Sequence, residues 1–464
     1  MSLISQRYSS PEMRSIWAQE QKYLWERELW ILVMKAQKKA GLEISQDAIA
    51  DYEKVKEHID TASIDARELS LHHDVKARIE EFNSLAGHEY IHLGLTSRDV
   101  TDNVELHQIH QSLILLQRKV LSLLARLAES AERYADLPMV GRTHNVPAQV
   151  TTLGRKFATW AEELLFALQH LEELSIRLPL RGIRGAIGTS VDQINLLGFV
   201  PEEIDRELAA AWGFTHSLEA PSQIYPRSID FEVVSTLAQL AAAPGTIATN
   251  IRLLSGFGLL AEGFAKGQVG SSAMPHKVNP RLSERVNSLT AILKGFVTMA
   301  AELTGQTWNE GDISCSAIRR VVLADSFHAI DGILDTTISI IDGIEVFPDQ
   351  ISKELSEHLP ILASTQVLML ATKKGVGRER AHEIIKGHAR EDEAERRKSG
   401  SSTFFDRITA DKELLISSQE LADVLTSPLK LAGDAPNQSR AIARRIKNLP
   451  GFADALRYSP GIAR

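Results

Sequence analysis

Residues 285–303 read RVNSLTAILKGFVTMAAEL, and this stretch decides the class of fold. Its apolar side chains recur at alternating steps of three and four residues, at Val286, Leu289, Leu293, Phe296, Ala300 and Leu303. That spacing places them on one stripe of an α-helix, as in the seam of a helical bundle or coiled coil. Such a stripe has to be covered by partner helices, some of which can come from other copies of the chain.

Two more stretches repeat this helical pattern. Their apolar positions are Leu113, Leu116, Val120, Leu124 and Leu127, and then Phe157, Trp160, Ala161, Leu164, Leu168 and Leu171. Segments rich in Gly and Pro interrupt the helical sequence, and no convincing series of alternating strands is present. We therefore predict an all-α fold of three helical domains: residues 1–105, a central long-helix bundle over 106–350, and residues 351–464.

The composition indicates an ordinary globular protein. Hydrophobic residues make up 44% and charged residues 24% of the 464, which excludes a disordered or collagen-like chain. With 52 basic and 60 acidic residues the net charge is −8, which argues against broad binding of nucleic-acid phosphates. Cys315 is the one cysteine, the N-terminus lacks the apolar core of a signal peptide, and no apolar run reaches about 18 residues. We expect a cytoplasmic protein with neither a membrane nor a nucleic-acid partner.

Residues 88–92, HEYIH, fit the HExxH pattern of zinc peptidases. On a helix the pattern sets His88 and His92 one turn apart, with Glu89 available as a base. The extended form of the motif fails, because Leu95 and Arg98 stand where Gly and His belong. The pattern fixes only three positions, so a chance match is the better interpretation.

The most informative segment is GSSAMPHKVNP, residues 270–280. A Gly-flanked serine pair, a lysine and an asparagine within one short polar loop are typical of a site that holds developing negative charge. Ser271 can act as a base only if its pKa is strongly lowered, and Lys277 and the following helix start could supply that field. The alternative is a surface loop that caps the next helix, but the density of functional residue types favours a site.

Other segments are ambiguous when taken singly. His144 in GRTHNVPAQ, residues 141–149, could donate a proton to a leaving group or could belong to a helix-capping segment. His73 with Asp74, and Thr96 with Ser97, could contact an anion or could be a solvated helix face and a helix cap. The Arg7–Tyr8 and Ser316/Arg320 segments are basic and hydroxylated, so they could hold a phosphate or form plain surface.

Taken together, these motifs resemble the fumarase/aspartase superfamily and, within it, the adenylosuccinate lyase family. Besides the 270–280 loop, the resemblance rests on RYSSPEM (7–13), HHDVKARIEEF (72–82), THNVPAQ (143–149), QIYPRS (223–228) and WNEGDIS (308–314). The motifs follow one another in the same order from residue 7 to about 325.

The resemblance implies a homotetramer whose central helices form a shared bundle, with each active site built from three subunits. It implies β-elimination of fumarate from adenylosuccinate, giving AMP, and from the related ribotide SAICAR, giving AICAR. It requires no metal and no organic cofactor, and its partners are small-molecule nucleotides.

The resemblance also implies roles for individual residues. Ser271 matches the general base, His144 the general acid and His73 the histidine that assists it. Lys277 matches a carboxylate binder, and Glu284 matches the carboxylate that holds the acid histidine in place. Matches to the substrate pocket are Arg7, Tyr8, His72, Asp74, His92, Thr96, Ser97, Thr143, Gln223, Arg227, Ser272, Met274, Asn279, Ser316 and Arg320.

Two positions depart from the family pattern. His72 stands where many members have Arg, and Gly311 stands where many have the Arg of Trp-x-Glu-Arg-Asp. The second change removes a cation expected near the phosphate. Two alternatives stay open beside this family: a related lyase or cycloisomerase with a different succinyl or carboxylated substrate, and a structural or binding protein that keeps an inactive lyase fold.

Overall fold

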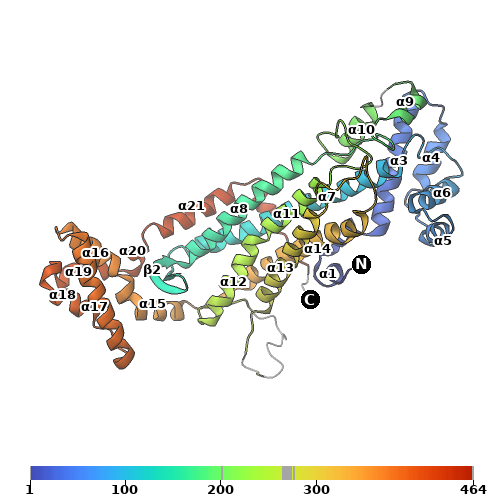
Figure 1. The fold of residues 1–464 in the computed structure, drawn as a ribbon. Coiled ribbons are helices and arrows are strands. Elements are labelled where there is room, and N and C mark those ends of the chain that lie inside the picture. The colour runs from blue at the N-terminus through green and yellow to red at the C-terminus, as the bar shows by residue number, and fades with distance from the viewer. Residues whose placement is uncertain (1, 200–201, 264–273, 275–276, 462–464) are drawn as a thin grey trace.

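The structure is a computed structural model that describes residues 2–199, 202–263, 274 and 277–461. Helices dominate these residues, which confirms the predicted all-α fold. The molecule is elongated, with the N-terminal helices at one end, a C-terminal group of helices at the other and long helices between them (Figure 1). None of the helices in the described part of the chain combines the length and the apolar character needed to cross a lipid bilayer.

The first helices of the chain build the N-terminal end. They are α1 (Leu3–Tyr8), α2 (Pro11–Ile16), α3 (Gln19–Lys39), α4 (Gln46–Val55), α5 (Thr61–Leu71) and α6 (Asp74–Ala86). A buried ion pair between Arg27 on α3 and Glu81 on α6 ties this end together. The Arg27 guanidinium also donates to the carbonyl oxygens of Val55, Lys56 and His58, so it closes the end of α4.

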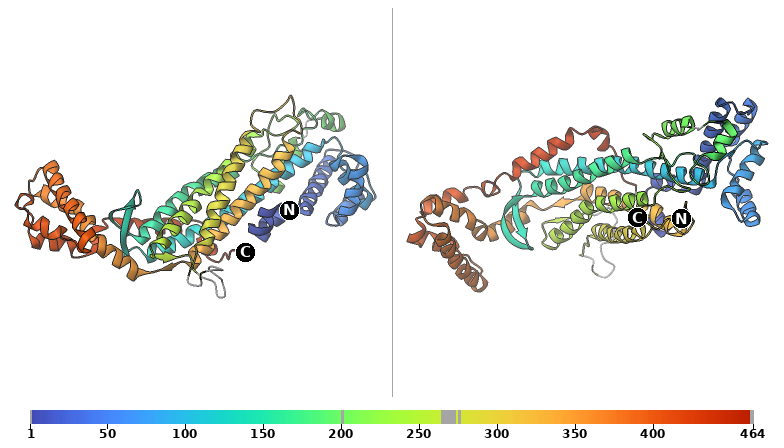
Figure 2. Two further views of the ribbon diagram at one scale, coloured as in Figure 1. Left: turned by 60° about the horizontal axis from the view of Figure 1, so that its bottom comes forward. Right: turned by 45° about the horizontal axis from the view of Figure 1, so that its top comes forward.

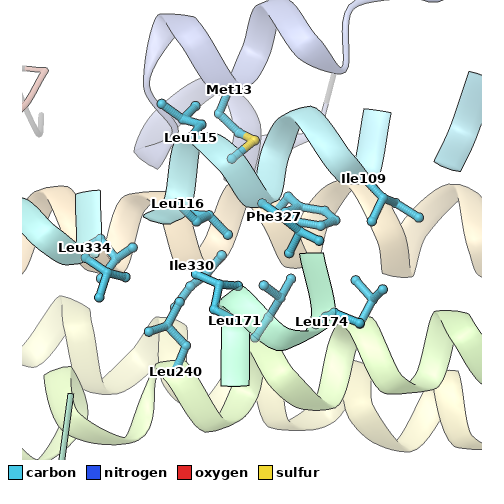
Figure 3. Packing of buried hydrophobic residues seen from close by; sticks show 14 of the residues in the cluster. Met13, Ile109, Leu115, Leu116, Leu171, Leu174, Leu240, Phe327, Ile330 and Leu334 are labelled. Atoms are coloured by element: carbon cyan, nitrogen blue, oxygen red, sulfur yellow. The ribbon is translucent and has the colours of Figure 1, made fainter. Parts of the chain in front are cut away.

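Six helices of the described residues make up the central bundle. They are α7 (Ser97–Arg133), α8 (Leu153–Arg177), α11 (Ser228–Leu240), α12 (Ala242–Gly256), α13 (Arg281–Ala301) and α14 (Ser316–Gly343), with the short α9 (Val191–Leu197) and α10 (Glu202–Trp212) between α8 and α11. The predicted stripes face inward: Leu116 on α7, Leu171 on α8 and Leu293 on α13 are fully buried. Figure 3 shows this packing around Leu116, Leu171 and Ile330 of α14. Each such side chain contributes about 1.5–3 kcal/mol by leaving water, so the stripes hold the bundle together.

Four short strands interrupt the helices of the described residues. Strands β1 (Pro138–Thr143) and β2 (Val146–Thr152) form an antiparallel hairpin, and β3 (Leu260–Ala261) pairs with β4 (Glu345–Val346). Between Thr143 and Val146 only His144 and Asn145 form the turn, with φ angles of 51° and 63°. Two left-handed residues in a two-residue loop match the type I′ turn, whose twist suits a hairpin. The capping alternative for this segment is wrong, because Thr152 is the residue whose side chain caps α8.

The remaining helices follow the bundle in sequence. They are α15 (Pro348–Leu362), α16 (Ser364–Lys373), α17 (Arg378–Ser399), α18 (Phe404–Ala410), a 3₁₀ turn (Lys412–Leu414), α19 (Ser418–Leu425), α20 (Pro428–Leu431), α21 (Ala435–Lys447) and α22 (Phe452–Ala455). Helices α16 to α19 enclose a small core of their own around Phe404 and Ile408. In contrast, α21 lies along α7 and α8, with Ala443 and Ile446 in the bundle core (Figure 2). The division into three domains stays a prediction. Within residues 351–464, α21 packs on the central bundle and not on the small core of α16 to α19.

Candidate active site

A cavity of about 500 Å³ lies between α6 and the start of α7. His73, His92, Thr96 and Ser97, all singled out from the sequence, line it. The other lining residues are Val75, Lys76, Ile79, Asn83, Glu89, Ile91 and Leu95. We call the cavity and the adjoining start of α7 the pocket end of the molecule. The cavity thus brings two imidazoles and two hydroxyls together within one chain.

His92 is held in one orientation and one protonation state. Its backbone is left-handed, with φ of 64°, and the indole N–H of Trp30 donates to its Nδ1 at 3.1 Å. Burial lowers the pKa of His92 to about 4, so the ring is neutral at pH 7. Because Nδ1 accepts this bond, the hydrogen-bond network assigns the proton of the neutral ring to Nε2. His92 can therefore donate a hydrogen bond to a ligand without carrying charge.

His72 and His73 form the joint between α5 and α6. His72 ends α5 in a left-handed conformation with φ of 53°, and His73 caps α6, its Nδ1 accepting from the backbone N–H of Lys76 at 3.3 Å. Asp74 is paired with Arg78 at 3.4 Å. The joint fixes the His73 imidazole at the rim of the cavity, with its Nε2 edge not used by the cap.

The HExxH segment does not form a zinc site. Residues 88–92 lie in a loop after α6, so the two histidines are not one helical turn apart. His88 Nε2 is 2.9 Å from Asp51, whereas His92 Nδ1 is bonded to Trp30. The two rings have separate partners, and the zinc peptidase interpretation is wrong for this chain.

A buried carboxylate that the sequence analysis missed fixes the start of α7. Asp99 is fully buried, accepts from the backbone N–H of Thr96 at 2.7 Å and is paired with the buried Arg181. It also accepts from the backbone N–H of Gly185 at 3.0 Å, which ties the loop after α8 to this helix end. Thr96 and Ser97 consequently stand at a rigid helix N-terminus, where N–H groups and the helix dipole favour an anion.

Gln223 and Arg227 lie near the pocket end. The backbone N–H of Gln223 donates to the carbonyl oxygen of Glu310 at 2.9 Å, so two loops run side by side. Arg227 is 3% exposed and is paired with Asp102 of α7 at 3.2 Å. Its buried guanidinium therefore fixes the segment that contains Gln223 and Arg227 against α7, next to the pocket end.

Ser316 and Arg320 occupy the first two turns of α14. Next to them the buried Arg319 is paired with Asp230 of α11 and Glu105 of α7, both at 2.8 Å. Burial lowers the pKa of Arg319, but these carboxylates outweigh that effect and hold the pKa well above its ordinary value. Arg319 therefore stays charged and anchors the start of α14 to the pocket end, while Arg320 is exposed.

Thr143 and His144 lie far from the cavity. They are at the tip of the β1–β2 hairpin, which follows the C-terminal end of α7, whereas Ser97 begins that helix (Figure 1). The 37 residues of α7 span about 55 Å at about 1.5 Å per residue. We call the β1–β2 turn the hairpin end. One chain does not bring His144 to His73.

Arg7 and Tyr8 lie beside the middle of α14, away from both the pocket end and the hairpin end. Tyr8 packs against Gly332 of α14, 16 residues after Ser316, which corresponds to about 24 Å along the helix. The Arg285 guanidinium lies 5.5 Å from the centre of the Tyr8 ring. The predicted phosphate set is thus divided within one chain.

The 270–280 loop is described only in part. Ser271 and Ser272 lie outside the described residues. Met274, Lys277 and Glu284 are exposed, and Asn279 is half-buried just before α13. The pairing of Glu284 with the acid histidine stays a prediction.

Comparisons with known proteins agree along the chain. A family model described as "Lyase" matches residues 6–294, and one described as "Adenylosuccinate lyase C-terminus" matches residues 360–442. Adenylosuccinate lyase of Saccharomyces cerevisiae is 32% identical over 96% of this chain and 94% of its own length. The Schistosoma mansoni enzyme of that name is 34% identical over 88% of this chain and 87% of its own length. The chain belongs to the adenylosuccinate lyase family.

Solved structures support the fold. A fumarate lyase from Mesorhizobium sp. BNC1 superposes with a TM-score of 0.81 at 23% identity, over 94% of this chain and 98% of that one. A 3-carboxy-cis,cis-muconate lactonizing enzyme from Pseudomonas putida gives 0.82 at 23% identity, over 96% and 99%. At this identity they establish the shared fold, and the family assignment rests on the sequence matches.

For a member of the adenylosuccinate lyase family, Gly311 is the notable departure, and the backbone conformation at this position suits glycine. Its φ is 142°, which side chains rarely adopt, and a β-carbon there would lie 3.3 Å from Ile224. The conformation of this loop favours glycine, and a glycine at position 311 cannot supply the cation that many family members have there.

Arg285 is a cation that the sequence analysis did not single out. It is half-buried one turn after Arg281, and burial lowers the pKa of its guanidinium. The pair of arginines four residues apart, directly after the 270–280 loop, is the signal that could have identified it.

Proposed function

We propose that this chain cleaves adenylosuccinate to AMP and fumarate, and SAICAR to AICAR and fumarate. We take the substrate class from the names of the relatives, and we assign the residue roles from the sequence motifs. The observation that supports the proposal best is the pocket end, where His73, His92, Thr96 and Ser97 line one cavity beside a helix N-terminus.

The reaction proposed is a β-elimination. The Ser271 alkoxide takes the proton from the carbon next to a succinyl carboxylate, which leaves an aci-carboxylate dianion. The C–N electron pair then leaves with the nitrogen, His144 donates the proton that this nitrogen needs, and the carbon–carbon double bond of fumarate forms. Ser271 takes up one proton and His144 releases one, so the reaction is balanced and needs no oxidant or reductant.

The pocket end supplies what this dianion requires. Donors that are fixed before the reaction stabilise developing charge without reorganisation. Thr96 and Ser97 at the start of α7 and the neutral Nε2–H of His92 are the donors we assign to the succinyl carboxylates. Lys277 precedes α13 and does not line this cavity, so we assign its ammonium to the same carboxylates from another copy of the chain. His73 assists His144 in the transfer to nitrogen.

We infer that each site is shared between subunits of a homotetramer. His144 and the cavity stand at opposite ends of α7, so a common site needs the hairpin end of another copy. The bundle helices carry exposed apolar side chains suited to such association, among them Phe166, Ile176, Leu253, Ile292 and Val321.

The first experiment adds purified protein to adenylosuccinate and identifies the products. We expect fumarate and AMP in equal amounts, unaffected by a chelator. Ser271→Ala should nearly abolish turnover, whereas Ser288→Ala should not, because within the described part of the chain the exposed Ser288 hydroxyl bonds the Glu284 carbonyl oxygen of its own helix. Wild-type rates in Ser271→Ala would remove Ser271 as the base.

Gly311 supports one alternative, a related lyase or cycloisomerase whose substrate lacks the phosphate. A folded tetramer with no turnover of adenylosuccinate or SAICAR would favour this alternative. Turnover of a succinylated or other carboxylated compound without phosphate would then establish it.

A further inference from the structure

Two residues of α14 form a seat for the end of α1. They are Asp331 and Gly332, which we call the α14 seat, and they contact Tyr8, Ser9 and Ser10. Tyr8 ends α1, and Ser9 and Ser10 connect it to α2. The seat therefore decides where the Arg7–Tyr8 pair stands relative to the bundle.

Gly332 allows the backbone of Tyr8 to lie directly on α14. A β-carbon at position 332 would be 2.7 Å from the Tyr8 carbonyl oxygen and 3.0 Å from the Tyr8 Cβ. Real Cβ atoms essentially never make a contact of 2.7 Å, so any larger residue must displace Tyr8 or α14. Glycine in the middle of a helix costs about 0.5–1 kcal/mol relative to alanine, which points to a specific reason for its presence here.

Asp331 fixes the same segment by hydrogen bonds. It is fully buried and accepts from the backbone N–H of Ser10 at 2.6 Å, from the Ser10 hydroxyl at 3.2 Å and from the Ser9 hydroxyl at 3.2 Å. The Ser9 hydroxyl also hydrogen-bonds His328 at 2.9 Å. Three donors from two adjacent residues leave this segment little freedom.

A buried lysine holds Asp331 in place. The Lys119 ammonium on α7 is fully buried, is paired with Asp331 and lies 3.0 Å from Asp335. Tyr458 donates to Asp335 at 2.7 Å, so the segment after α22 closes the cluster. Buried ionic groups of this kind are seldom the most stable way to fill a core, and fixing one conformation is a reason to keep them.

We propose that Asp331 and Gly332 are positioning residues that hold Arg7 and Tyr8 at the substrate phosphate. The backbone of Tyr8 lies against Gly332, and the Arg285 guanidinium lies 5.5 Å from the centre of its ring. The proposal rests on the proposed function, in which Arg7 and Tyr8 contact the phosphate. Displacing Tyr8 should weaken binding of the phosphate and leave the elimination chemistry itself intact.

The test compares Gly332→Ala with a matched control, Gly387→Ala on α17. Apart from the backbone of its own helix, no atom among the described residues lies within 4 Å of a β-carbon at position 387, and both glycines are in long helices. In Gly332→Ala the KM for adenylosuccinate and the inhibition constant of AMP should rise about tenfold or more with kcat little changed, since misplacement of about 1 Å can have such effects. Gly387→Ala should keep both constants. An unchanged KM in Gly332→Ala would overturn the proposal.

A second variant and a mutant cycle complete the test. If Gly332→Ala does not fold, Ser9→Ala decides, because it removes a donor to Asp331 without adding volume, and its KM should rise in the same way. The double variant of Gly332→Ala, or Ser9→Ala, with Arg7→Ala should weaken substrate binding by less than the sum of the two single changes in binding free energy. The reason is that both substitutions act on the same contact with the phosphate. Fully additive changes in binding free energy would mean that the α14 seat does not act through Arg7, which would overturn the proposal. A failed Arg7 assignment is distinguishable, since Arg7→Ala alone would then leave KM unchanged.

Discussion

The pocket end and the hairpin end are built in opposite ways. At the pocket end, His92 and His73 are fixed by hydrogen bonds from Trp30 and Lys76 beside a cavity of about 500 Å³. At the hairpin end, His144 is exposed on a two-residue turn. One chain therefore carries the histidines and hydroxyls that line the cavity, together with a candidate proton donor that cannot reach them.

The largest effect we expect comes from separating the two ends on different chains. His73→Gln and His144→Gln should each lower kcat by about 10²–10⁴, the usual loss for an acid or base. Mixing the two inactive variants should restore a substantial part of the activity, because some sites then combine an intact pocket end with an intact hairpin end. Turnover of adenylosuccinate after subunit exchange measures this.

The control is a mixture of His144→Gln and His144→Ala, which lacks an intact hairpin end on every chain. It should stay inactive after the same exchange. Equal activity in both mixtures, with exchange demonstrated, would contradict a site shared between the two ends.

The next effect concerns acid stability at the pocket end. Burial lowers the pKa of His92 to about 4 and that of His107, packed between Trp25 and Trp212, to about 3. The unfolded chain binds protons at these residues near pH 6.5, so stability is full above that pH and falls as pH drops toward 4. Each histidine contributes about 1.4 kcal/mol per pH unit, so both together give about 3 kcal/mol per unit.

Urea unfolding between pH 4.5 and 8 measures that slope. His107→Gln should lower the slope by about 1.4 kcal/mol per pH unit, whatever its effect on stability at pH 8. A slope equal to that of the parent protein would mean that His107 is protonated in the folded state.

A smaller effect is expected from the donor that orients His92. Trp30→Phe keeps most of the ring packing and removes the N–H that bonds His92 Nδ1, so the KM for adenylosuccinate should rise about tenfold, equivalent to one hydrogen bond. Trp17→Phe is the matched control, because it removes an indole N–H that donates to Ser112 at 3.0 Å, away from the cavity. Equal changes in the two variants would mean that the effect is one of general stability.

The helices were predictable and the tertiary contacts were not. The stripe from Val286 to Leu303 needs only the 3.6-residue period, so the bundle follows from the sequence. The hairpin escaped prediction because His144–Asn145 lacks the usual Asn-Gly signal of a type I′ turn. Asp99 and Arg285 escaped because their neighbours, Arg181 and Tyr8, are far away in the sequence.

The return of α21 to α7 and α8 has a consequence for how the protein is made. Helices α15 to α20 form a loop out of the bundle, so the last strip of its core emerges from the ribosome long after α7 and α8. Translation at about 5–20 residues per second leaves those two helices uncovered for tens of seconds. A nascent chain in this state exposes the stripe that Ala443 and Ile446 later cover, which makes it a natural client for chaperones during synthesis.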